Sequence, residues 1–276
     1  MNHFYRVIWN AATATWTAVA ETARGHGKAK STRDGKRRYA RALFRASLAG
    51  GLLGGAAMAI PQTVLAQSVA VASGKTNTYV APNGTTVVNI DTANAAGLSH
   101  NRYNSYNVND KGLVLNNTTS AQIAYQSQLA GQVTANFNMT NAARVILNEV
   151  VSNNRSTLAG FTEVLGGRAD VILANPYGIT CSGCGFINTD RVTLTTGVPY
   201  LNANGSLGGF TVNQGDILIN GSGLNATAQQ MLDLVARTVK LDGTINAQDL
   251  SITAGANRYD YVSRSVTGAV PGAGTT

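Results

Sequence analysis

Two cysteines are the residues whose types and spacing suggest chemistry most directly. Cys181 and Cys184 form a Cys-x-x-Cys pair, and the 276-residue chain holds no other cysteine. Such a pair can act as a redox centre in cytosolic proteins, whereas two such pairs would suggest zinc. In an oxidising compartment the same pair forms a disulfide. The pair is therefore a redox centre, a structural disulfide or two free thiols, and the compartment decides among them.

Other groups that could do chemistry are sparse. His100 is the one histidine after residue 66. A zinc site of the histidine type or a Ser-His-Asp triad needs partners at usable spacing, so we expect His100 to be structural and no metal or cofactor to be bound. A sugar-cleaving enzyme would gather several carboxylates on one face, which only a fold could reveal. After residue 66 the carboxylates stand singly, at Asp91, Asp110, Glu149, Glu163, Asp170, Asp190, Asp216, Asp233, Asp242, Asp249 and Asp260.

The charge of the chain is concentrated near its N-terminus. The whole chain has 21 Lys and Arg against 13 Asp and Glu, a net charge of +8. Residues 1–66 hold ten of the basic and two of the acidic residues, so the remainder holds 11 of each sign and is neutral. A nucleic-acid-binding protein keeps its basic excess in the folded part, because phosphate neutralisation supplies much of the affinity. This distribution argues against nucleic acid as a partner.

Residues 33–67 have the three parts of a secretory signal. A basic run from Arg33 to Arg41 precedes an apolar, Gly- and Ala-rich stretch at residues 48–60, which is short for a membrane-spanning helix. The residues that follow fit a signal-peptidase site, so we predict cleavage between Ala66 and Gln67. The signal implies passage through the general secretion machinery of the inner membrane. Beyond that membrane a disulfide becomes the preferred interpretation of the cysteine pair, and so small a loop would mainly fix a corner.

The signal is unusually long at its front. Composition predicts a short amphipathic helix there, with Phe4, Ile8 and Trp16 near one face. The order Tyr-Arg-Val-Ile-Trp-Asn, then Trp, then Ala-Glu-x-Ala-Arg-Gly within residues 1–28 resembles the extended signal peptide of very large Gram-negative exoproteins. This resemblance implies slowed inner-membrane export, which keeps a long passenger unfolded in the periplasm.

From Gln67 onward the composition is that of strands and turns, rich in Asn, Thr, Gly, Val and Ile. Long helical patterns are lacking, which argues against doubly wound α/β folds. Many short strands at similar spacing suggest a sandwich, a barrel or a β-solenoid, and strands joined by Gly or Asn corners favour the solenoid. We expect strands in residues 85–90, 112–117, 144–147, 170–173, 191–195, 216–220, 238–241 and 249–253.

Three segments need separate treatment. Residues 226–239 have a helix-like spacing around Met231, Leu232 and Val235, which the sequence leaves undecided. A solenoid cannot leave its ends open, so we expect the segment after Gln67, including residues 79–80 and 86–90, to cap the N-terminal end. Residues 263–276 turn to Gly, Ala, Ser and Thr, which predicts a tail or the start of a linker.

The mature part resembles the two-partner-secretion domain, also called the haemagglutination-activity domain, of filamentous haemagglutinins, related haemolysins and contact-dependent inhibition toxins. The resemblance implies an all-β, right-handed parallel β-helix with an N-terminal cap and extra-helical hairpins, and it makes part of residues 226–239 strand. It divides the chain into a signal at 1–66, a β-helix domain at 67–262 and a tail at 263–276. The matching blocks are residues 96–104, 106–109, 112–117, 146–150, 166–181 and 255–261.

In this family an outer-membrane barrel transporter recognises the domain through its periplasmic domains, and the domain then nucleates folding outside. The resemblance ties this role to an Asn-Pro-Asn-Gly turn, which reads Asn175, Pro176, Tyr177 and Gly178 here, and to the block containing Asn148, Glu149 and Val150. An upstream Asn-Pro-Asn-Leu turn is represented only by residues 136–139. The turn at 175–178 is either a folding corner, for which Pro and Gly are suited, or a direct contact with the transporter. Related haemolysins and toxins also carry a cysteine pair.

The sequence therefore predicts a non-enzymatic export and folding module of a large secreted adhesin, haemolysin or inhibition toxin. Its partners would be the barrel transporter and, after export, a receptor on a host or neighbouring cell. One alternative is a free-standing carbohydrate-binding adhesin with Tyr103, Tyr106 and Tyr259 as exposed contacts. Another is a β-helix enzyme that acts on polysaccharides.

Overall fold

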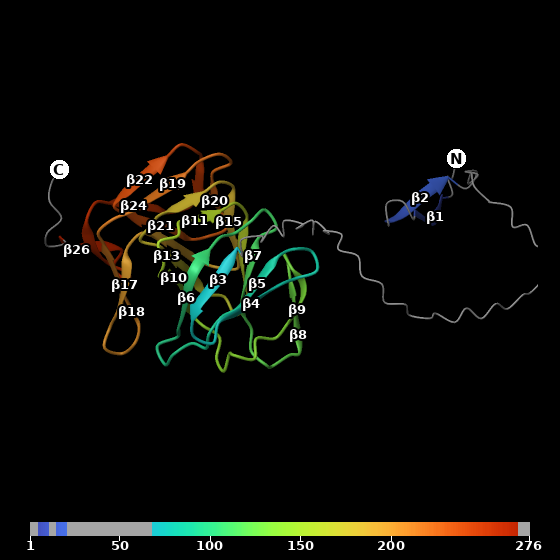
Figure 1. The fold of residues 1–276 in the computed structure, drawn as a ribbon, viewed down its shortest axis with the longest axis horizontal. Helices are drawn as coiled ribbons and strands as arrows, with labels where there is room; N and C mark the ends of the chain where they lie inside the picture. The colour runs from blue at the N-terminus through green and yellow to red at the C-terminus, as the bar shows by residue number, and fades with distance from the viewer. Residues whose placement is uncertain (1–4, 11–14, 21–67, 270–276) are drawn as a thin grey trace, which may run out of the picture. The chain divides into compact units, whose positions relative to one another are not determined.

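The computed structural model describes residues 5–10, 15–20 and 68–269, and the chain divides into two compact units, Met1–Ile60 and Pro61–Thr276 (Figure 1). In the first unit β1 (Tyr5–Asn10) and β2 (Thr15–Ala20) form an antiparallel hairpin. The helix predicted at the front of the signal is therefore wrong for these residues. They are rich in β-branched and aromatic side chains, which favour strands. The predicted cleavage site, Ala66–Gln67, lies outside the described residues.

The second unit is built from coils of parallel strands. Its first seven-stranded sheet runs in the order β24 (Leu250–Ala254), β21 (Met231–Ala236), β16 (Arg191–Thr195), β13 (Asp170–Ala174), β10 (Val145–Val150), β6 (Leu98–Tyr106) and β3 (Val69–Ser73). The second runs in the order β23 (Ile245–Ala247), β20 (Leu224–Ala226), β15 (Cys184–Ile187), β12 (Phe161–Gly166), β7 (Leu113–Asn117), β5 (Thr86–Asn89) and β4 (Asn77–Val80). A four-stranded sheet stacks β11 (Ser156–Leu158), β14 (Ile179–Cys181), β19 (Asp216–Ile219) and β22 (Thr238–Leu241).

Each complete coil contributes one strand to each of these three sheets, as in the succession β10, β11, β12. Neighbouring coils pair in parallel, for example Ile146 with Val171 and Val171 with Val192. Alternate residues then point inward, and one buried apolar core receives Ile146, Ile179 and Leu224 from the three sheets. This arrangement is the predicted parallel β-helix.

Antiparallel strands close the N-terminal end. β3 pairs antiparallel with β6, and β4 pairs antiparallel with β5. Tyr79 and Val80, in β4, belong to this cap as predicted. β5 itself pairs in parallel with β7, so Thr86–Asn89 is the first parallel strand of its sheet and lies beneath the cap.

Two extra-helical elements cover the outside of the coils. β17 (Val198–Leu201), β18 (Leu207–Val212), β25 (Asn257–Asp260) and β26 (Ser265–Ala269) form an antiparallel sheet. Their side chains make a second core with the outer face of the first sheet, in which Phe210 packs with Leu147 and Ile172. The buried Asp233 anchors this layer, because Arg191 and Arg264 each donate a hydrogen bond from Nε to it at 2.8 Å.

The other extra-helical element is the hairpin of β8 (Ala124–Ser127) and β9 (Gly131–Thr134), seen in green beside β4 and β5 in Figure 1. It forms a third small core with the second sheet through Val133 and Val114. The buried Glu163 fixes the hairpin turn, accepting hydrogen bonds from Ser127 Oγ at 2.6 Å and from the Gln128 and Leu129 amides at 3.0 Å.

The segments that the sequence left open are strands. β20, β21 and β22 cover much of residues 226–239 and pair in parallel with their neighbours, so the helix-like spacing is overridden by coil stacking. Beyond residue 262, where a tail was expected, β26 continues the antiparallel sheet by pairing with β25. Among the residues described, the structure contains no helix whose length and hydropathy would let it cross a membrane.

Candidate transporter-recognition site

The turn at residues 175–178 lies at the corner between β13 and β14. The Gly178 amide donates to the Asn175 carbonyl at 3.0 Å, which closes the turn. The Tyr177 amide donates to Asn175 Oδ1 at 3.0 Å. The side-chain amide of Asn175 donates to the carbonyl of Asn154 and to Ser156 Oγ, both at 2.9 Å. Asn175 is fully buried, so its side chain joins this corner to the preceding coil.

Gly178 is required by both conformation and space. Its φ is +105°, a region that residues with a Cβ rarely adopt. A Cβ there would also meet Nη1 of Arg155 and would lie 2.9 Å from the Asp216 carbonyl oxygen. Arg155 stands there because it binds Asp216 through both terminal nitrogens, at 2.8 and 3.1 Å. These hydrogen bonds from Arg155 hold the pKa of Asp216 below its usual range.

Within this turn the four residues divide into two pairs. Asn175 and Gly178 are buried and make the corner. Pro176 is half-buried, and Tyr177 is 49% exposed. The position where this chain departs from the family motif, Tyr177, is therefore one that faces outward.

Turns closed in the same way recur elsewhere in the fold. In each, a glycine with positive φ donates its amide to the carbonyl of an asparagine three residues earlier. None of these other asparagines is fully buried, unlike Asn175. The recurring turns lie at residues 94–97, 109–112, 202–205 and 220–223. The Asn-x-x-Gly turn is thus a general corner of this fold, and burial of the asparagine distinguishes residues 175–178.

The upstream segment at residues 136–139 has the same internal bonding without proline or glycine. The Met139 amide donates to the Asn136 carbonyl at 3.1 Å, and the Asn138 amide donates to Asn136 Oδ1 at 3.0 Å. The buried Asn136 donates to the carbonyls of Ile90 and Asn116, both at 2.8 Å. Phe137 is 74% exposed. The two motif segments are therefore two corners of one kind, each with a buried asparagine and an exposed aromatic residue.

The structure brings the block at residues 148–150 next to the turn at 175–178. β10 and β13 are neighbours, and Glu149 pairs with Ala174, the residue before Asn175. Asn148 points inward, where it accepts a hydrogen bond from the Tyr103 hydroxyl at 3.1 Å. Glu149 faces outward and is paired with His100 Nε2 at 2.8 Å. Glu149 and Val150 line a hollow of about 430 Å³ together with Pro176 and Tyr177.

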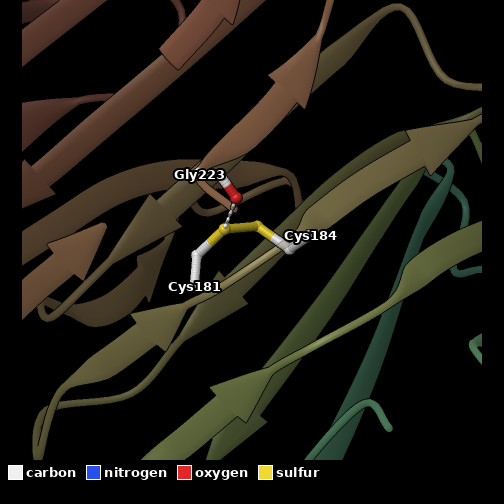
Figure 2. The surroundings of a disulfide bond; sticks show 3 residues. All are labelled: Cys181, Cys184 and Gly223. Carbon is white, nitrogen blue, oxygen red and sulfur yellow. Dashed lines mark hydrogen bonds between the residues drawn. A yellow bond between two sulfur atoms is a disulfide. The ribbon is translucent and has the colours of Figure 1, made fainter. Parts of the chain in front are cut away.

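The cysteine pair is a disulfide at the corner between β14 and β15 (Figure 2). The two Cα atoms lie 5.5 Å apart and both residues are buried. Gly183, between them, has a φ of +86° and donates its amide to the Gly223 carbonyl at 2.8 Å. Cys181 Sγ lies 3.3 Å from the same oxygen; a disulfide sulfur carries no proton, so this is a packing contact. The disulfide thus fixes a corner that packs on the next coil.

Three aromatic residues predicted as exposed sugar contacts are buried. Tyr103 and Tyr259 are fully buried, and Tyr106 is 2% exposed. Tyr103 and Tyr106 lie in the β-helix core, and Tyr259 lies under the extra-helical sheet. Burial raises the pKa of all three hydroxyls. These residues are therefore packing residues, and the prediction that they contact a sugar is wrong.

Several carboxylates of the described residues are engaged in contacts between structural elements. No group of three or more His, Cys, Asp or Glu side chains within residues 68–269 is arranged to hold a metal ion. Asp216 and Asp233 are paired with arginines, and Glu163 is saturated by the β8–β9 turn. These charges hold elements together.

The sequence missed both Arg155 and the hairpin of β17 and β18, which forms one wall of the hollow. The adjacent residues Asn204 and Gly205 between two strand-forming segments were a usable hairpin signal. Nothing in the sequence pairs Arg155 with Asp216, which are 61 residues apart.

Comparison with known proteins gives two family matches and several relatives. Residues 1–50 match the extended signal peptide of type V secretion systems, and residues 62–275 match the TPS secretion domain. A tRNA nuclease CdiA of Yersinia mollaretii is 50% identical over 198 residues, which is 71% of this chain and 7% of that protein. Toxin CdiA of Yersinia pestis is 39% identical over 273 residues, which is 96% of this chain and 8% of that protein. The chain thus spans less than a tenth of the length of these relatives.

A solved structure is similar as well. The filamentous hemagglutinin secretion domain has a TM-score of 0.71 and 39% identity, over 76% of this chain and 71% of that one. Fold and matches together define the class of protein: an export-targeting β-helix domain behind a secretion signal. The chain belongs to the TPS secretion domain family. It is exported through the periplasm to the cell surface or the medium, and an outer-membrane transporter is its partner.

Proposed function

We propose that this chain is the export and folding-nucleation module of a large secreted adhesin, haemolysin or inhibition toxin. The CdiA relatives, two of which are named as tRNA nuclease and toxin, support a toxin passenger in particular. On this proposal the module itself catalyses no reaction. Its work is done by turns, strand edges and coil stacking.

The observation that carries the nucleation proposal is the uncovered last coil. Leu250 and Ile252 in β24 stand in register with Leu232 and Leu234 of β21, which are fully buried. Leu250 and Ile252 are themselves 41% and 44% exposed. A further coil stacked on β24 would bury these side chains, and burial of apolar surface supplies the free energy of coil addition. The domain would thus act as a template for strands that emerge after it.

For transporter recognition we propose that the four residues 175–178 have two different roles. Asn175 and Gly178 form the corner of the folded domain, while Pro176 and Tyr177 contact the periplasmic domains of the transporter before the chain folds. Exposure of Tyr177 supports this division, because a side chain that is not needed for core packing can be selected for contact with a partner. Asn148 and Val150 serve the core, and Glu149 is the outward-facing member of its block.

Binding to the transporter's purified periplasmic domains tests this proposal. The double variant P176A/Y177A should bind several-fold more weakly than the wild-type chain when both are diluted from urea. The matched control is D110A/K111A, which changes the two central residues of the equivalent turn at 109–112 and should bind as wild type does. Equal binding by all three chains would refute a contact at Pro176 and Tyr177. Equal weakening by both variants would show that any altered turn has this effect.

A further inference from the structure

The hollow beside residues 175–178 is lined by five separate segments, one of which includes β17. Arg102 comes from β6, Glu149 from β10, Tyr177 from the turn, and Gln214 from the loop after β18. Its volume of about 430 Å³ is within the usual range of small-ligand sites. Because these segments span more than a hundred residues of sequence, the hollow exists only in the folded domain.

One part of the lining is apolar and faces outward. Tyr177, Val151 and Val198 line the hollow and are 49%, 40% and 47% exposed. A large exposed aromatic residue flanked by aliphatic side chains is suited to the C–H face of a sugar ring. Tyr177 is the one aromatic residue among the residues that line this hollow.

The rest of the lining carries hydrogen-bonding groups open to solvent. Asn213 and Gln214 are exposed amides, and Thr211 adds a half-buried hydroxyl. Arg102 is 51% exposed, and the nearest carboxylate, Glu149, lies 3.5 Å from its Nε. The same oxygen, Glu149 Oε2, also lies 2.8 Å from His100 Nε2, so Arg102 shares this carboxylate with His100 and uses one of its five N–H donors toward it. The guanidinium of Arg102 therefore keeps donors for an incoming anion, for which its planar fork is well shaped.

The loop that carries the amides is held in place. Gly215 follows Gln214 with a φ of +80°, and a Cβ there would collide with the Pro176 carbonyl oxygen. The loop and the turn therefore touch backbone to backbone. A hollow whose walls are fixed in this way loses little freedom when it is filled.

We propose that this hollow binds an acidic saccharide, with its carboxylate on Arg102, its ring against Tyr177 and its hydroxyls on Asn213 and Gln214. Tyr177 belongs to both proposals, but the saccharide site differs from the export contact because it forms only after the chain has folded. It gives the exported module a binding activity of its own.

The test uses the full chain, exported and purified, against two sets of immobilised oligosaccharides. One set ends in N-acetylneuraminic or glucuronic acid, and the other ends in galactose or glucose. The wild-type protein should bind the acidic set in preference to the neutral set. Tyr177→Ala should weaken binding about tenfold, as expected for loss of an aromatic stacking partner. Arg102→Gln should abolish the preference for acidic ends.

Two variants serve as controls and one as a second probe. Phe137→Ala removes an exposed aromatic residue outside the hollow, and Arg168→Gln removes an exposed arginine outside it. Both should bind as wild type does. Gln214→Ala leaves the turn untouched and should still weaken binding, which guards against misfolding of the Tyr177 variant.

Failure to bind acidic ends, equal binding to both sets, or equal loss in the controls would overturn the saccharide proposal. Wild-type chain that is exported normally but binds no saccharide would leave the export proposal standing.

Discussion

Replacing Asn175 with alanine should destabilise the folded domain far more than the same change in an equivalent turn. Asn175→Ala removes two donated hydrogen bonds and one accepted one, and it leaves the buried Ser156 hydroxyl without its partner. At roughly 1 kcal/mol for each bond, with a further penalty for the orphaned hydroxyl, the free energy of unfolding should fall by about 3 kcal/mol. Asn109→Ala is the matched control, since its exposed side chain accepts one bond, from the Lys111 amide. The free energy of unfolding of the Asn109→Ala variant should fall by less than about 1 kcal/mol.

The assay is urea-induced unfolding of the purified exported chains, followed by far-ultraviolet circular dichroism. With a slope typical of a domain of this size, the midpoint of the Asn175 variant should fall by roughly 1 M urea relative to wild type. The slope itself should not change. If the two variants unfolded at the same urea concentration, burial would not be what distinguishes residues 175–178, and our account of that corner would be refuted.

Four further results are expected. Gly178→Ala should lower the melting temperature more than Gly255→Ala. The two glycines have nearly the same φ, +105° and +107°, but only at Gly178 would the added Cβ clash with Arg155 and Asp216. Equal losses of melting temperature would contradict a steric role for these two neighbours. Reduction of the disulfide should cost about 2 kcal/mol or less, since the closed loop is short, and Cys181→Ser/Cys184→Ser protein should show no further change on reduction. Because Arg155 lowers the pKa of Asp216, the ion pair between them stabilises the folded domain above the unfolded-state aspartate pKa of about 4. This stabilisation is lost as the pH falls below that value. Asp216→Asn should therefore flatten the acid limb of the stability curve, by less than about 1 kcal/mol for a pair this exposed, and an unaltered acid limb would count against the pairing. Burial raises the pKa of Tyr103 and Tyr106, so the free energy of unfolding should fall as pH rises above about 10, and Tyr103→Phe/Tyr106→Phe should reduce that fall.

The strand pattern of the coils was predictable because each coil repeats the same chemistry. The sequence predicted eight strands, and all eight are parallel strands of the β-helix, with Arg191–Thr195 and Thr238–Leu241 matching residue for residue. Residues 192–197 (VTLTTG) and 250–255 (LSITAG) have similar sequences, and the strands they contain, β16 and β24, belong to the same sheet with β21 between them. Short β-branched or Leu-rich runs between Gly, Asn or Asp corners carry this information locally.

Burial of the tyrosines was not predictable, because it depends on elements far away in sequence. Tyr259 is covered where β25 pairs with β18, 49 residues earlier at Phe210. Tyr103 is buried because its strand, β6, lies between the cap strand β3 and the coil strand β10. A tyrosine among Asn and turn-forming residues is predicted to be exposed unless the strands that cover it are known.

The residues predicted for transporter recognition lie side by side in the fold, and their role in recognition stays a prediction. The resemblance pointed to residues 175–178 and 148–150, and the fold brings them to adjacent strands. It could not separate buried from exposed members of the turn, nor supply Arg102 and Gln214, which arrive from other coils.

The decisive experiment for transporter-dependent export is secretion of residues 1–276 from a Gram-negative host, with and without the cognate outer-membrane transporter. We expect a shortened chain beginning at Gln67 to reach the medium only when the transporter is present. A chain that leaves the cell without the transporter, or stays in the periplasm with it, would contradict the claim that this domain directs transporter-dependent export.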